Sequence, residues 1–239
     1  MGRLRNQLGG DPFWSDEEVL DHGFNFRPDW WRTRIPNDVW TASLHRLPDA
    51  TGGRGYHRVT RADLLRARTD NPDDIVSLLV ACYAWGTGDL GFRVGRRARA
   101  FTVSRPDVLA DKLAGAVAVL RDSGPVAAYQ ALARSGRFNL PHLGPSFYTK
   151  FLYAADAASS GAPGRALILD RFVAIALIEV EHWEMPEAGP WHFDTYRRWL
   201  EFAHDEAAKE SAEGMPVRPD AIEVAMFRKG QAIYRDRRR

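Results

Sequence analysis

One stretch in the middle of the chain combines turn formers, a serine and a lysine. Residues 140–150 read Leu-Pro-His-Leu-Gly-Pro-Ser-Phe-Tyr-Thr-Lys. The prolines and the glycine cannot continue an upstream helix, and Ser146 is a residue type that favours the N-cap of a new one. Such a turn leaves backbone N–H groups free at a helix start, which predicts a seat for a phosphate. Lys150 adds an amine, which can contact a phosphate or, when neutral, act as a nucleophile.

A carboxylate follows this lysine after an interval of 20 residues. Asp170 ends the apolar run 166–169 and stands directly before a second apolar segment, 172–180. An aspartate in that place is typical of a helix N-cap. A carboxylate can also stabilise positive charge and move protons, and the N-cap role does not prevent this.

Together these features resemble the helix-hairpin-helix DNA glycosylases, in particular the 8-oxoguanine glycosylase branch. The sequence at 140–144 matches the Leu-Pro-x-x-Gly hairpin with which that family grips the DNA backbone. The resemblance implies that the lysine of the following helix is the nucleophile. It also implies that the aspartate about twenty residues later assists the reaction. It also predicts DNA contacts at His142, Leu143, Gly144, Ser146 and Thr149.

The position of the lysine departs from the family pattern. The family usually has its lysine two residues after the hairpin glycine, and here Ser146 occupies that place. Lys150 lies four residues further on, so the two side chains share one helix face. In a longer hairpin, as in some archaeal members, Lys150 takes the nucleophile's place. Otherwise Ser146 is the equivalent residue, as in the monofunctional adenine-mismatch glycosylases, where a water attacks. The lysine-to-aspartate interval favours Lys150.

The resemblance implies an enzyme that flips a modified base out of double-stranded DNA and excises it, with an 8-oxoguanine-like purine as the expected base. Lys150 would form a Schiff base with the sugar, with strand cleavage as a possible second activity, and Asp170 would stabilise the developing positive charge. Burial of Lys150 among aromatic residues would favour its neutral amine. Two alternatives are a monofunctional glycosylase, in which Asp170 activates water, and a non-catalytic DNA-binding protein on the same scaffold.

Basic residues gather in the segment that leads to the hairpin. Residues 91–150 contain ten lysines and arginines against three aspartates, a local net charge of +7, whereas the whole chain has only +2. This distribution suits a surface that faces phosphates, although solvated arginines are the alternative. We therefore predict DNA contacts at Arg93, Arg96 and Arg97.

Two further segments are candidates for contacting bases. A glycine-rich loop, 86–91, follows the apolar helix predicted over 74–85, and in the glycosylases such a loop pushes side chains into the duplex. By position, Trp85 and Thr87 would fill the gap or contact the orphan base, with a core position for Trp85 as the alternative. In the same family a C-terminal helix lines the base pocket, which predicts such a role for Glu223 and Phe227. Core packing for Phe227 and a solvated Glu223 are the alternatives.

Composition sets the remaining expectations. The 239 residues are 45% hydrophobic and include eight tryptophans, so a large core can form. The single Cys82 excludes an internal disulfide and a four-cysteine cluster. His182, His192 and His204 lack a carboxylate at ligand spacing, so no metal is predicted, and no cofactor. No membrane span or signal peptide is evident, which predicts a cytoplasmic, nucleoid-associated monomer.

The elements that must position these residues are helices. A Thr60–Asp63 capping box starts a short helix to residue 66. Further helices are predicted over 74–85, 92–100, 106–121, 126–133, 146–158, 172–180, 193–209 and 220–235, and one within 30–47. The expected fold is all-α, with two helical lobes and the active cleft between them. Residues 1–60 form an arm and helical extension, and 61–239 form the glycosylase-like domain, whose helices over 193–235 complete the second lobe.

Overall fold

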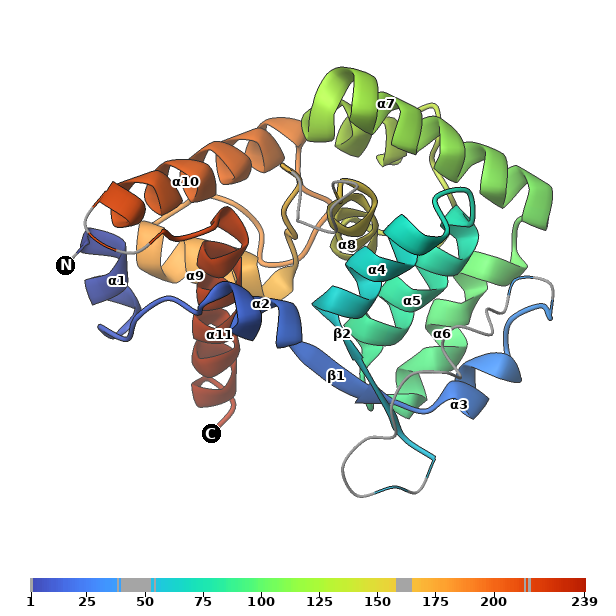
Figure 1. The fold of residues 1–239 in the computed structure, drawn as a ribbon, viewed down its shortest axis with the longest axis horizontal. Helices are drawn as coiled ribbons and strands as arrows, with labels where there is room; N and C mark the ends of the chain where they lie inside the picture. The colour runs from blue at the N-terminus through green and yellow to red at the C-terminus, as the bar shows by residue number, and fades with distance from the viewer. Residues whose placement is uncertain are drawn as a thin grey trace.

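The computed structural model describes residues 2–37, 39, 53, 55–157, 165–212, 214 and 216–239. Within these ranges the chain forms eleven helices and one two-stranded sheet (Figure 1). The helices are α1 (Arg3–Leu8), α2 (Asp16–Asp21), α3 (Pro28–Arg32), α4 (Arg61–Asp70), α5 (Ile75–Thr87), α6 (Gly91–Thr102), α7 (Pro106–Leu132), α8 (Pro145–Ala155), α9 (Arg171–Glu181), α10 (Phe193–Ala212) and α11 (Pro219–Asp236). The predicted all-α class is confirmed.

The helices form two lobes. Figure 1 shows α3 to α7 on one side of the molecule and α1, α2, α9, α10 and α11 on the other. Helix α8 lies between them, and its side chains from Tyr148 to Ala155 are all buried. The segment that leads into α9 meets α8 at this junction, since the Leu169 N–H donates to the Thr149 hydroxyl. The chain therefore brings Lys150 and Asp170 to the place where the lobes meet.

Capping and turn-forming residues in the sequence predicted most helix starts. Thr60 and Asp63 form the predicted capping box, and the helix that they start runs on to Asp70. Asp74 caps α5 by accepting from the Ser77 N–H. The predicted break between residues 121 and 126 is a kink within α7, where Gly124 has a φ of 84° that glycine adopts without strain.

The N-terminal arm contains a strand that the sequence reading missed. β1 (Gly23–Phe26) pairs with β2 (His57–Thr60) in antiparallel register, with Gly23 opposite Thr60 and Phe26 opposite His57. The pairing joins segments about thirty residues apart, so no short-range pattern announces it. Of the helix predicted within 30–47, the described residues contain α3, which ends at Arg32. Residues 38 and 40–47 lie outside the described ranges.

The core runs through both lobes. It contains large aromatic side chains from each, among them Trp31, Tyr83, Phe101, Tyr196 and Trp199. None of the helices in the described part of the chain is long and apolar enough to cross a bilayer.

Candidate active site

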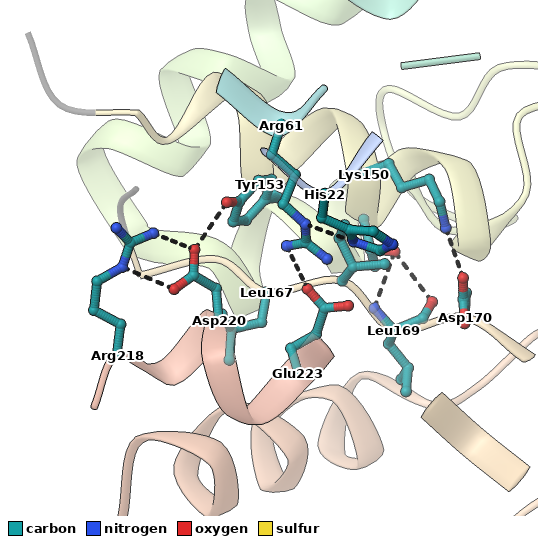
Figure 2. A network of polar contacts seen from close by, with 12 residues as sticks. His22, Arg61, Lys150, Tyr153, Leu167, Leu169, Asp170, Arg218, Asp220 and Glu223 are labelled. Carbon is teal, nitrogen blue, oxygen red and sulfur yellow. Dashed lines mark hydrogen bonds and ion pairs between the residues drawn. The ribbon is translucent and has the colours of Figure 1, made fainter. Parts of the chain in front are cut away.

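Lys150 and Asp170 form a buried ion pair. The Lys150 Nζ donates to Asp170 Oδ2 at 2.8 Å (Figure 2). It also donates to the Ser146 carbonyl at 3.1 Å. The other carboxylate oxygen of Asp170 accepts from the backbone N–H groups of Phe172 at 3.0 Å and Val173 at 3.3 Å. Asp170 is therefore both the N-cap of α9 and the partner of the lysine, and only 5% of Lys150 and 8% of Asp170 remain exposed.

Thr149 locks the two segments together. Its hydroxyl accepts from the Leu169 N–H at 3.2 Å and lies within donating distance of the carbonyls of Pro145, at 2.8 Å, and Leu169, at 3.1 Å. The side chain is fully buried, so it is not placed for the DNA contact that the hairpin resemblance predicts. Its place one residue before Lys150 instead fixes the spacing between the lysine and the Asp170 segment.

Helix α8 begins slightly earlier than predicted, with its N-cap two residues before Ser146. Gly144 occupies the N-cap and Pro145 the first helical position, so Ser146 lies inside the first turn and does not cap the helix. Proline at this position suits a helix start because its missing N–H would be unpaired anyway. The prediction of a Ser146 N-cap is therefore wrong. His142 has a left-handed φ of 63°, and its carbonyl accepts from the Tyr83 hydroxyl at 3.0 Å, which ties the hairpin to α5.

A cavity of ≈ 390 Å³ opens beside the ion pair. Lys150, Asp170 and Ser146 lie in its wall. Six of the other lining residues are aromatic: Phe24, Trp85, Phe147, Phe172, Phe227 and Tyr234. They come from both lobes and from β1 in the arm, so the cavity is an interlobe pocket with aromatic rings in its wall and the lysine–aspartate pair on one side. Such pockets are the usual form of a small-molecule site.

The lack of a side chain at Gly86 allows Lys150 to lie close to α5. A Cβ added at Gly86 would lie 2.9 Å from Phe147 Cε1 and 3.0 and 3.1 Å from the Cδ and Cε of Lys150. Only a residue without a side chain lets the lysine stem lie this close to α5. The Nζ ends 5.8 Å from the Trp85 ring centroid and 5.9 Å from that of Phe147.

A basic groove of ≈ 880 Å³ adjoins the cavity and runs along the hairpin. Arg93, Arg96, Arg97 and Arg134 line it together with residues 139–147. Arg93 and Arg97 also line the cavity, so they lie at the border of the two. Burial, together with the charges of Arg93 and Arg96, lowers the pKa of Arg97 to about 10. Arg97 remains a cation at neutral pH and donates to the Gly86 carbonyl at 3.1 Å.

The predicted base-contacting residues separate into two groups. Trp85 and Phe227 are buried in the cavity wall, with 2% and 8% of their surface exposed. Thr87 also borders the cavity, and no described residue pairs with its hydroxyl. Glu223 does not line the cavity at all. It is fully buried behind the cavity, where it forms an ion pair of 2.6 Å with Arg61, so the predicted base contact is not supported (Figure 2).

The sequence reading missed the group behind the cavity. Arg61 lies over the rings of Trp85 and Tyr153 and donates to His22 Nδ1 at 3.4 Å. The His22 carbonyl accepts from the Trp85 indole N–H at 3.1 Å. Burial and the positive charges of Arg61 and Lys150 lower the pKa of His22 to about 3, so its ring is neutral. No motif marks these residues, which only the packing of β1 against α5 and α11 brings together.

Within the described ranges, no group of three or more His, Cys, Asp and Glu side chains could hold a metal ion. The cavity itself presents an amine, a carboxylate, aromatic rings and neighbouring guanidinium groups.

A two-lobed helical protein with a Leu-Pro-x-x-Gly hairpin, and with a lysine–aspartate pair in the cavity between its lobes, has the architecture of the helix-hairpin-helix DNA glycosylases. The family model described as "Putative 8-oxoguanine DNA glycosylase OGG-like protein" matches residues 17–227, so the chain belongs to that family. The match extends well beyond the hairpin, Lys150 and Asp170 on both sides, and it takes in most of the arm. Searches of curated proteins and of solved structures gave no match.

Proposed function

We propose that the protein is a DNA glycosylase that flips a modified base into the interlobe cavity and releases it. The buried Lys150–Asp170 pair in the cavity wall, 2.8 Å apart and next to the hairpin, is the observation that carries this proposal. The aromatic walls offer stacking surfaces for a flipped base, and extrusion is required because a base within a duplex cannot reach the pair. An 8-oxoguanine-like purine is the proposed base.

In the proposed reaction, the Lys150 ammonium first loses a proton to solvent, and the neutral Nζ then attacks the anomeric carbon of the sugar. The bond between that carbon and the base nitrogen breaks, its electron pair leaves with the base, and the base takes up a proton. Asp170 stays ionised beside the sugar, where it stabilises the positive charge that develops on the ring. The nitrogen, now bonded to the sugar, loses a second proton to solvent, and its electron pair forms a C=N bond as the ring C–O bond breaks. The ring oxygen takes up a proton. The resulting protonated Schiff base permits cleavage of the strand on the 3′ side.

DNA would lie along the basic groove, with its phosphates on the hairpin and on Arg93, Arg96 and Arg97. We assign the duplex-probing role to Phe92 in place of Trp85 and Thr87. Phe92 is 80% exposed at the start of α6, and it lines the groove beside these arginines. An exposed aromatic ring among phosphate-binding residues is suited to stacking on bases. Trp85 and Thr87 would form the base pocket.

Borohydride trapping tests the nucleophile. A duplex that contains 8-oxoguanine and one that contains an abasic site are each incubated with the wild type and with Lys150→Gln. The proposal expects a covalent adduct with the wild type and none with the variant. Base release without any adduct, and retained in Lys150→Gln, would instead support the monofunctional enzyme, in which Asp170 activates water. A wild type that binds both duplexes but neither releases a base nor forms an adduct would contradict the proposed activity on these substrates.

Asp170→Asn tests the carboxylate. Asparagine can still cap α9, so we expect the variant to fold and to bind DNA. Loss of the charge should lower the single-turnover rate by about 10²–10⁴-fold, the usual contribution of a positioned acid or base. Asp74→Asn is the matched control, because it makes the same change at the N-cap of α5, away from the cavity. A binding protein without catalysis would be indifferent to both changes.

A further inference from the structure

One stripe of α11 leads from the cavity to the outside. Phe227, Gln231 and Tyr234 all line the cavity and follow one another at intervals of four and three residues, so they share a helix face. Phe227 is buried, Gln231 and Tyr234 are half-buried, and the next residue on the stripe, Arg238, is exposed. The helix therefore leads from the cavity to an exposed arginine two residues beyond its last residue, Asp236.

Tyr234 holds two arginines at this edge. The guanidinium of Arg171 lies 4.7 Å from the Tyr234 ring centroid and that of Arg238 lies 5.6 Å from it. The Arg238 Nη1 also donates to the Tyr234 hydroxyl at 3.2 Å. Arg171 follows Asp170 in sequence and lines the cavity itself. The two cations come from the start of α9 and the end of α11, and a single ring orients them.

The acidic groups nearby leave Arg238 unpaired. Glu187 forms ion pairs with Arg171, at 3.4 Å, and with Arg237, while Glu179 is paired with Arg237. Among the described residues, no carboxylate forms an ion pair with Arg238. Its charge is thus available to a phosphate.

We propose that Arg171 and Arg238 form a second phosphate-binding rim of the cavity, opposite the one that Arg93 and Arg97 form. Figure 1 shows α6 in one lobe and α9 with α11 in the other. The inference rests on the proposed function, because a nucleotide in the cavity enters with a phosphate on each side of its sugar. Positive charge on both sides of the mouth would hold both phosphates while the base occupies the cavity.

The salt dependence of DNA binding tests the rim. The dissociation constant for a duplex with a tetrahydrofuran abasic analogue is measured between 50 and 200 mM salt for the wild type and Arg238→Gln. Loss of one phosphate contact should reduce the slope of log affinity against log salt by about 0.9. Across this fourfold range, the advantage of the wild type over the variant should therefore shrink by about threefold. Arg171→Gln with Arg238→Gln should lower the slope by about 1.8.

Arg228→Gln is the matched control. Arg228 lies on the same helix but packs over Trp14 at 4.7 Å, away from the cavity. An unchanged salt slope in Arg238→Gln would contradict the proposed phosphate-binding rim. An equal reduction of the slope in Arg228→Gln would also contradict it. Base release by the wild type is measured separately. A wild type that binds DNA but releases no base would contradict the proposed glycosylase activity. The salt slope of Arg238→Gln would still test the phosphate-binding rim independently.

Discussion

At the scale of single residues, the position of the Lys150 side chain depends on a glycine, Gly86. Gly86 lies within α5, where alanine would ordinarily be more favourable by about 1 kcal/mol. The glycine is nevertheless required, because a Cβ there would approach Phe147 and the Lys150 stem to about 3 Å. The same contact that limits substitution at Gly86 therefore sets the direction of the lysine amine toward Asp170.

Gly86→Ala should separate folding from catalysis. The helix gains propensity while the lysine stem is displaced, so we expect a melting temperature close to that of the wild type. A displacement of about 1 Å in a catalytic group can cost about 10²-fold in rate, and a loss of that order is expected in single-turnover base release. Gly95→Ala on α6 is the control, since its Cβ would lie 3.8 Å from its nearest neighbour. Wild-type rates in Gly86→Ala would show that the lysine has room to move.

His22 gives the fold a defined response to acid. Its pKa is about 3 in the folded protein and about 6.5 in the unfolded chain. Between these values the unfolded state binds more protons, so His22 weakens the fold as the pH drops below 6.5. Its largest contribution is about 1.4 kcal/mol per pH unit. Unfolding in urea at pH 7 and pH 5 should show a smaller loss of stability for His22→Gln than for the wild type. Equal losses would mean that His22 is not buried as a neutral ring.

At the scale of elements, the sequence predicted correctly the features that depend on residues close to one another in the chain. The Thr60–Asp63 box, the Asp170 cap and the break at Gly124 each depend on residues within a few positions of one another, and all three are present. Ser146 was misassigned because the helix starts at Pro145, which moves the N-cap two residues earlier, to Gly144. β1 was missed because its partner strand is distant in sequence, and with it the contribution of Phe24 and His22 to the site.

The buried pair of Arg61 and Glu223 joins α4 to α11, the helix that supplies Phe227 to the cavity. Removing one partner leaves an unpaired buried charge, so Arg61→Met should lower the free energy of unfolding by about 3–5 kcal/mol. Arg61→Met combined with Glu223→Leu should be less destabilised than the sum of the two single variants, because neither charge is then left alone. The free energy of unfolding of the wild type, the two single variants and the double variant is measured by chemical denaturation, which completes the double-mutant cycle. Strict additivity would show that the two side chains stabilise the fold independently.

At the scale of the whole molecule, the site exists only where the lobes meet. The lysine, the aspartate and the basic segment were readable from sequence because motif and composition carry them. The cavity was not, because its walls come from residues 24, 85–97, 146–150, 170–172 and 227–234, and only the packed fold gathers these segments. The same fold placed Glu223 behind the wall, although its spacing of four residues from Phe227 had suggested a shared face toward the base.

This arrangement predicts which parts of the protein DNA should protect from hydrogen exchange. A duplex held across the mouth should slow exchange in the first turn of α6, in the hairpin before α8, at the start of α9 and at the end of α11. The middle of α10 should be unaffected, because it borders neither the cavity nor the groove. At an abasic duplex concentration 100 times the dissociation constant, a covered amide that exchanges only from the free protein should slow by up to about 100-fold. Protection confined to α6 and the hairpin would place the DNA on one lobe alone. Protection in both lobes, reduced at the end of α11 in Arg238→Gln, would show that the two sides of the mouth hold one duplex.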